Sequence, residues 1–194
     1  MNIILTNIYL FVLATVLAIL EIQIEGQNGW AKNLPTWRPK IQSFFVKIYS
    51  RFMSGKEMTG YHLSMFAFVL LIFGLPFVFG FPFTIENLLK TVSFYFIFCI
   101  LWDFLWFVLN PWYPLSQFKG RILGFHHKKW LWGIPTDYWG GAVISLLVVL
   151  PLLGVDKSII NWWLINMAMF CGETALLILF SLLILKIDHW NERK

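Results

Sequence analysis

Five long apolar runs divide the chain, separated by polar segments of very different lengths. The runs lie at about 3–22, 61–81, 88–109, 139–155 and 159–186. About 20 apolar residues span the hydrocarbon core of a bilayer as an α-helix, whereas a membrane β-strand would alternate over about ten residues. Because the runs are continuous, the pattern predicts an all-α integral membrane bundle of five transmembrane helices. The fourth run is short, and Pro151 near its end predicts a kink or the helix exit.

A sixth helical pattern lies between the first two runs, at about 39–53. Its apolar positions recur at helical spacing and its basic positions fall largely opposite them, and Pro39 suits a first helical turn. These positions are Ile41, Phe44, Phe45, Ile48 and Phe52, against Lys40, Lys47 and Arg51. We expect an amphipathic helix that lies in the headgroup layer and contacts membrane lipids. With no separate soluble segment, residues 1–194 are predicted to form a single transmembrane domain.

The composition agrees with a membrane protein. The chain is 59% apolar and 13% charged, with a mean hydropathy of +0.71, whereas soluble domains carry about a quarter charged residues. The first run has no Lys or Arg ahead of it, unlike a secretory signal, so we expect a retained helix. Cys99 and Cys171 each lie inside a predicted span and indicate neither a disulfide nor a metal framework.

The basic residues predict how the bundle is oriented. Thirteen of the fifteen Lys and Arg residues lie in the segments 26–60 and 110–138 or at the C-terminal end, and only Lys90 and Lys157 lie in the short opposite loops. By the positive-inside rule, both long loops and the C-terminus are cytoplasmic and the N-terminus is outside. The net charge of +5 fits a surface against anionic lipid and requires no nucleic-acid partner.

Several ionisable residues lie toward the same predicted side. Glu21 and Glu25 are four residues apart at the inner end of the first helix and share a face. His62 opens the second helix, and Asp103 lies about two-thirds of the way inward along the third. A carboxylate inside a span costs about 2.5–3.5 kcal/mol, so Asp103 is expected to be protonated, to face a wet cavity or to bind a cation. We expect Glu21, Glu25, His62 and Asp103 to bind a divalent metal together.

The segment FHHKKWLWGIPTDYWGG, residues 125–141, supplies further candidates. We assign His126 as a metal ligand, and His127 and Asp137 to acid–base chemistry, with the choice of inward-facing histidine left open. Carboxylate and imidazole ligands suit iron, manganese or zinc, and we favour iron for a carboxylate-rich set. The alternative is a basic patch on lipid phosphate, with the tryptophans in an interfacial belt. The motifs Glu-x-x-His, HExxH, the P-loop and the dinucleotide fingerprint are absent from the sequence.

Three functions fit this pattern. The first is a metal-dependent membrane enzyme at the cytoplasmic leaflet that acts on a lipid or another lipophilic substrate. We favour oxidation–reduction over hydrolysis, because no Ser-His-Asp or Cys-His pattern offers a nucleophile. The second is a proton or cation transporter that uses Asp103 and Glu173 as relay sites. The third is a non-catalytic scaffold subunit, and the oligomeric state is left open.

Overall fold

The computed structural model describes residues 2–26, 29–40, 43–53, 55–113, 115, 118 and 130–190. Over these ranges the chain is mostly helical, with very little strand. The helices are α1 (Ile3–Glu25), α2 (Phe44–Phe52), α3 (Gly60–Val78), α4 (Ile85–Leu109), α5 (Thr136–Val149) and α6 (Ile159–Leu179). Five of them, with the turns that extend α5 and α6, are long and apolar enough to cross a membrane. The predicted all-α bundle is therefore confirmed.

The last two long helices continue as irregular helical turns. Regular α-helix ends at Val149 in α5, and a 3-10 turn covers Leu150–Gly154. Pro151 cannot donate a backbone hydrogen bond, which accounts for the change at the predicted position. Beyond α6, a π-helical turn covers Phe180–Leu185 and a short 3-10 turn covers Ile187–His189.

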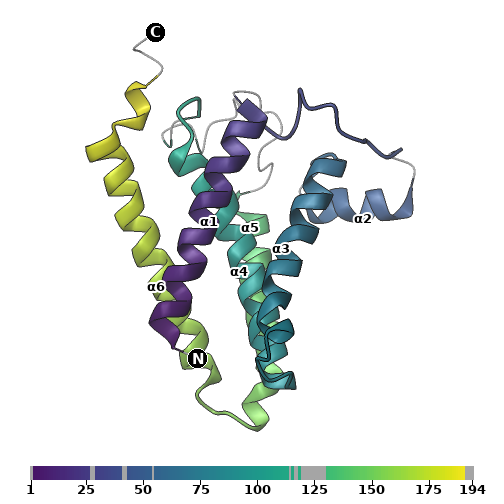
Figure 1. The fold of residues 1–194 in the computed structure, drawn as a ribbon, viewed down its shortest axis with the longest axis vertical. Coiled ribbons are helices and arrows are strands. Elements are labelled where there is room, and N and C mark those ends of the chain that lie inside the picture. The colour runs from purple at the N-terminus through teal and green to yellow at the C-terminus, as the bar shows by residue number, and fades with distance from the viewer. Residues whose placement is uncertain are drawn as a thin grey trace.

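Both long connections meet at one end of the bundle, which we call the loop end. Here α1 and α4 end while α3 and α5 begin, and the chain's N-terminus lies at the opposite end (Figure 1). Helix α2 lies across the direction of the long helices near the loop end, with Phe44 and Phe45 exposing 70% and 75% of their surface. The predicted amphipathic helix is thus present, but it is shorter than the predicted range of 39–53. It begins at Phe44 after the N-cap Ser43, so Pro39 precedes the helix and is not in its first turn.

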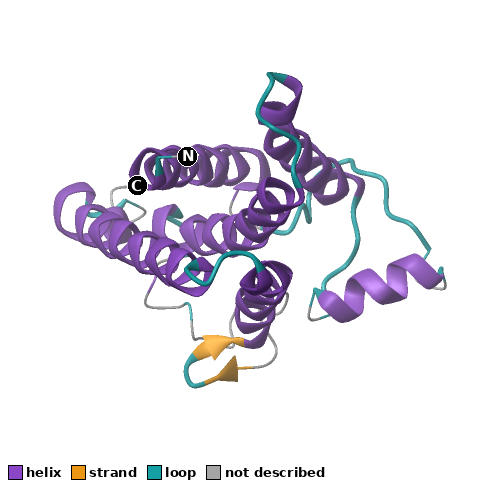
Figure 2. Cartoon of the chain, turned by 90° about the horizontal axis from the view of Figure 1, so that it is seen from below, coloured by secondary structure: helices purple, strands orange, loops and turns teal. Residues whose placement is uncertain are grey.

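A small hairpin also lies at the edge of the bundle (Figure 2). Its strands, β1 (Trp130–Leu131) and β2 (Ile134–Pro135), pair antiparallel. Trp132 and Gly133 both have positive φ, which is typical of the tight two-residue turns that join such strands. The hairpin leads directly into α5, whose Trp139 indole donates to the Leu131 carbonyl at 3.1 Å.

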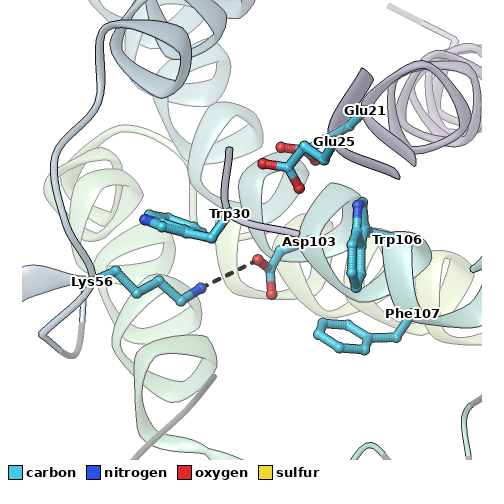
Figure 3. A pocket seen from close by; sticks show the side chains of 7 residues that line it. All are labelled: Glu21, Glu25, Trp30, Lys56, Asp103, Trp106 and Phe107. Atoms are coloured by element: carbon cyan, nitrogen blue, oxygen red, sulfur yellow. Dashed lines mark ion pairs between the residues drawn. The ribbon is translucent and has the colours of Figure 1, made fainter. Parts of the chain in front are cut away.

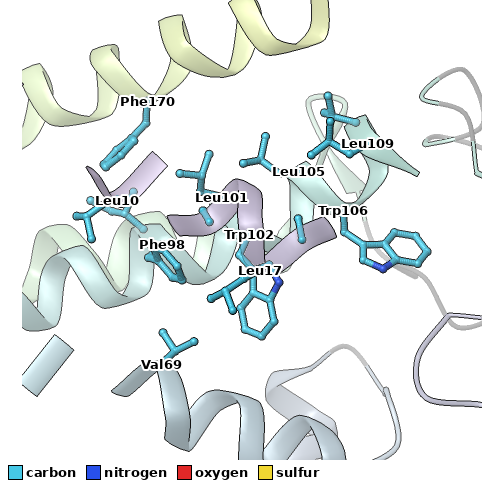
Figure 4. Close-up of a cluster of buried hydrophobic side chains, with 14 of the residues drawn as sticks. Leu10, Leu17, Val69, Phe98, Leu101, Trp102, Leu105, Trp106, Leu109 and Phe170 are labelled. Carbon is cyan, nitrogen blue, oxygen red and sulfur yellow. The ribbon is translucent and has the colours of Figure 1, made fainter. Parts of the chain in front are cut away.

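Helix α4 is the centre of the core. Its buried side chains include Phe98, Leu101, Leu105 and Trp106, and they pack against α1 and against Phe170 of α6 (Figure 4). On the α5 side, a Cβ added to Gly141 would lie 2.7 Å from Cδ1 of Ile100. A glycine therefore permits the close approach of α5, as is common between membrane helices.

Hydrogen bonds attach α6 and its extension to the other helices. The Asn7 amide of α1 donates to the Asn166 side-chain oxygen at 2.6 Å, and both residues are fully buried. The Trp163 indole donates to Ser145 Oγ of α5 at 2.9 Å. Such bonds contribute about 0.6 kcal/mol each on average in membrane bundles, so their main effect is to set the position of α6.

Candidate metal centre

Two helices bring three buried ligand groups together at the loop end. Glu21 and Glu25 lie one turn apart near the end of α1, and His62 lies in the first turn of α3. The distance from His62 Nε2 is 3.4 Å to Glu25 Oε1 and 3.9 Å to Glu21 Oε1. One ligand atom from each residue lies within 4.8 Å of the other two. This buried group could hold a metal ion.

The orientation of His62 is set by the cap of α3. Thr59 is the N-cap, and its Oγ1 accepts from the His62 backbone N–H at 3.2 Å and lies 2.7 Å from Nδ1 of the ring. The ring also stacks on Trp30, with centroids 3.9 Å apart. Nε2 faces the glutamates and makes no hydrogen bond with any described residue. Metal-binding histidines commonly have this arrangement, with the second ring nitrogen fixed by another group.

The turn after α1 is held in an unfavourable backbone conformation. Trp30 and Ala31 have φ values of 45° and 50°, and such non-glycine residues cost about 1–3 kcal/mol each. The turn directs the Ala31 N–H to Glu25 Oε1 at 2.5 Å and places the Trp30 ring on His62. Arg38 holds it by donating to the Ala31 carbonyl at 2.7 Å. The strained turn therefore contacts two of the candidate ligands, the Glu25 carboxylate and the His62 ring.

A second set of charges lies beside the first. Lys56 Nζ lies 3.6 Å from Asp103 Oδ1 and 4.4 Å from the centroid of the Trp30 ring. The Lys56 side chain exposes 2% of its surface, and the Asp103 side chain exposes 32%. The Tyr138 hydroxyl of α5 donates to Asp103 Oδ2 at 2.5 Å. Asp103 therefore has a cation at one oxygen and a hydroxyl donor at the other.

Residues from both sets line one small pocket (Figure 3). Its lining comprises Glu21, Glu25, Trp30, Lys56, Asp103, Trp106 and Phe107. The pocket volume is about 30 Å³, and about 10–15 Å³ accommodates one water. The pocket thus has room for an ion with very little solvent, and two aromatic side chains form an apolar wall beside the carboxylates.

The charges in the pocket favour an additional cation. Three carboxylates line it with one ammonium, that of Lys56, so the lining carries an excess of two negative charges when all three acids are ionised. An ionised carboxylate without compensation is costly away from water. A divalent ion at Glu21, Glu25 and His62 would offset this excess.

The spacing of the ligand atoms also fits a metal. Metal–nitrogen and metal–oxygen bonds are about 2.0–2.2 Å, so two atoms on one ion lie at most about 4.4 Å apart. The separations of 3.4 Å and 3.9 Å from His62 Nε2 fall inside this limit.

Two tyrosines outside the long helices respond to the same negative charge. Burial, and then the charge of Glu21, raises the pKa of Tyr49 in α2 well above its ordinary value. Burial, and then the charge of Glu25, raises the pKa of Tyr113 after α4. Both hydroxyls stay protonated at neutral pH.

The structure brings four of the predicted site residues close together, and three of them, Glu21, Glu25 and Asp103, line the pocket. Glu21, Glu25 and His62 form the group of ligand atoms, whereas Asp103 lines the pocket but contacts Lys56 and Tyr138. The sequence hypothesis treated Asp103 as a further ligand. In the structure Asp103 lies beside the group of Glu21, Glu25 and His62, and Lys56 largely offsets its charge.

The remaining predicted residues lie elsewhere. His126 and His127 are outside the described residues. Asp137 lies in the first turn of α5, adjacent to Tyr138, and is not one of the described residues that line the pocket. Glu173 lies on α6, which contributes none of the described lining residues.

Three important residues were not predicted from the sequence. Thr59, just ahead of an apolar run, carries the usual signal of a helix N-cap, which also places His62 in the first turn. Lys56 was counted only among the basic residues of segment 26–60, and Trp30 was assigned no role. Their burial beside the carboxylates depends on the tertiary path of the long connection, which no local pattern encodes.

Comparison with models of protein families, with curated proteins and with solved structures gives no significant match. Similarity therefore contributes nothing to the functional assignment. The residues of the pocket and their geometry carry it instead.

Proposed function

We propose that the protein is a metal-dependent membrane enzyme that binds one divalent ion through Glu21, Glu25 and His62. The observation that carries this proposal is the His62 ring. It is 3% exposed, Thr59 engages one nitrogen, and the other faces two buried carboxylates without a hydrogen bond to a described residue. A buried imidazole in this setting is well suited to a metal and poorly satisfied without one.

Iron is the metal we favour over zinc or manganese. Two carboxylates and one imidazole form an oxygen-rich set of three protein ligands, and such sets suit first-row divalent ions. Three protein ligands also leave positions open for water or substrate, as catalytic sites require. When bound, iron would supply electron transfer, for which reason we favour oxidation–reduction over hydrolysis.

A lipophilic substrate fits the surroundings of the site. Trp106 and Phe107 line the pocket beside the carboxylates, and the site lies at the end of five helices that are apolar enough to cross a membrane. We further propose that the loop end faces the cytoplasmic leaflet, because the predicted positive side contains both long connections. Helix α2 would then lie in the headgroup layer, with Phe44 and Phe45 in the acyl region.

Proton handling in this enzyme would involve the residues next to the metal. Tyr138, Asp103 and Lys56 form a continuous line of contacts that ends at the pocket. This line can hold a proton at the Tyr138 hydroxyl and a positive charge at Lys56 Nζ. The proposed acid–base roles of His127 and Asp137 remain predictions from the sequence.

Elemental analysis of purified protein tests the proposal. After growth with added iron, zinc and manganese and removal of any affinity tag, we expect about one metal ion per chain. His62→Ala should lose it, whereas His189→Ala, which changes a histidine outside the group of Glu21, Glu25 and His62, should retain it. Monodisperse wild-type protein without stoichiometric metal would refute the proposal.

A proton or cation transporter is the second candidate, and Glu173 favours it. This residue lies within α6, and its Oε2 is buried without a hydrogen bond to a described residue. Carboxylates in such positions often mark ion pathways. Purified protein in liposomes should then conduct protons or divalent cations, and Glu173→Gln should abolish that flux. An absence of flux together with bound metal would leave the enzyme as the better proposal.

A further inference from the structure

We propose that the Lys56 ammonium takes the place of a second metal ion and limits the centre to one. This inference rests on the proposed function, because it presupposes a metal at Glu21, Glu25 and His62. It assigns Lys56 a role in determining the stoichiometry and charge of the centre, beyond being a partner of Asp103.

The pocket has the composition of a larger cation site. Asp103 lines it together with Glu21 and Glu25 (Figure 3), and it is not part of the group that Glu21, Glu25 and His62 form. Carboxylate-lined centres with two metals place the ions about 3.5–4 Å apart. With Lys56 removed, three carboxylates would face a single small volume, and the His62 imidazole contacts two of them. Together these groups are a suitable ligand set for two ions.

Lys56 occupies this volume as a cation would. Its Nζ lies 3.6 Å from Asp103 Oδ1 and 4.4 Å from the centre of the Trp30 ring, and its side chain is 2% exposed. The face of an indole ring attracts an ammonium group, whereas it offers no lone pair to a metal ion. The Trp30 ring therefore favours an organic cation over a metal at this position.

The segment directly after Lys56 is fixed by hydrogen bonds to the backbone and the side chain of Glu57. The Trp30 indole donates to the Glu57 carbonyl at 2.9 Å, and the Arg38 guanidinium donates to the Glu57 carboxylate at 2.8 Å. Two residues further on, Thr59 caps α3. The Lys56 ammonium is thus positioned by a segment that hydrogen bonds hold in place, unlike the ammonium of a flexible surface lysine.

Metal stoichiometry in neutral variants tests the inference. Lys56→Met and Lys56→Gln each remove the charge, one with an apolar and one with a hydrogen-bonding side chain, so that a folding defect in one leaves the other available. Each protein would be equilibrated with excess Mn²⁺, passed through a desalting column and assayed for metal per chain. Electron paramagnetic resonance would then distinguish two isolated ions from an exchange-coupled pair.

We expect one ion per chain in the wild type and in Lys56→Arg, and two coupled ions in Lys56→Met and Lys56→Gln. Lys56→Met with Asp103→Asn should return to one ion, because the third carboxylate is gone. A single ion in both neutral variants, or two ions in the wild type, would overturn the inference while leaving a metal centre in place. No ion in the wild type would instead refute the proposed function.

Discussion

Asp103 and Glu173 are both acids within long apolar helices, yet their surroundings differ completely. Asp103 lies toward the loop end of α4 and contacts Lys56 and Tyr138 beside a pocket. Glu173 lies on α6, and its Oε2 has no hydrogen bond to a described residue. Within the most apolar 18-residue window of α4, 61% of the residues are buried, whereas the figure for the span Ile159–Leu185, which contains α6, is 11%. The difference teaches that the connection between α1 and α3, which supplies Lys56 and Trp30, completes the site around Asp103.

The largest expected effect is that of Asp103→Asn. The change would leave the Lys56 ammonium buried beside a neutral amide, and breaking a buried pair costs about 3–5 kcal/mol. We expect the lower end of this range, because Asp103 is 32% exposed. Metal affinity should also fall about 10–100-fold, as for other neighbours of metal ligands, because Lys56 is free to approach the glutamates.

Thermal unfolding in detergent and a metal titration would measure both changes. Glu173→Gln is the matched control, since it neutralises an acid in another apolar helix. If the two variants unfolded at the same temperature and bound metal equally, the contrast between the two acids would be wrong.

Metal removal should have the next largest effect. An ion that binds only the folded state stabilises it by about 2.7 kcal/mol at a concentration 100 times its Kd. A chelator should therefore lower the unfolding temperature of the wild type and of Glu173→Gln to a similar extent. Glu25→Gln should start lower and respond little, because it lacks one of the proposed ligands. An equal response in Glu25→Gln would exclude this residue as a ligand.

Tyr138→Phe should have a moderate effect. It removes the hydrogen bond from the hydroxyl to Asp103 and keeps the ring, and hydrogen bonds to charged groups contribute about 1.5–3 kcal/mol. Chemical or thermal unfolding should show a loss near the lower value, with metal stoichiometry unchanged. Loss of the metal in Tyr138→Phe would indicate that Asp103 coordinates the ion directly.

Glu173→Gln should have the smallest effect. The side chain is partly exposed, and substitutions away from buried pairs and networks usually change stability by less than about 0.5 kcal/mol. Unfolding temperature and metal content should match the wild type. A large destabilisation would mean that Glu173 has an essential partner and that the comparison with Asp103 understates its role.

Much of the fold could be predicted because each long helix is a continuous apolar run. The α1 boundary shows what was missed. The helix reaches Glu25, three residues beyond the predicted end, and Gly26 follows it with a φ of 62°. A glycine directly after a helix is a standard stop signal, so this boundary was encoded locally. The extra turn places both glutamates within the helix and on one face.

The candidate site was predictable only where helix periodicity and helix ends determine it. Glu21, Glu25 and His62 lie near the predicted ends of two spans, and the structure brings them together. The buried position of Lys56 depends on the Trp30–Ala31 turn, whose positive φ values occur at residues that rarely adopt them. No sequence pattern signals such a turn, because contacts across the whole connection stabilise it.

X-ray absorption spectroscopy at the iron edge, on tag-free protein reconstituted with Fe²⁺, tests the metal centre most directly. We predict a single shell of nitrogen and oxygen atoms at about 2.0–2.2 Å, the range typical of imidazole and carboxylate ligands. An imidazole scattering contribution should be present in the wild type and weaken in His62→Ala, but not in His189→Ala. The absence of bound iron, or a spectrum unaffected by His62→Ala, would contradict a metal centre at Glu21, Glu25 and His62.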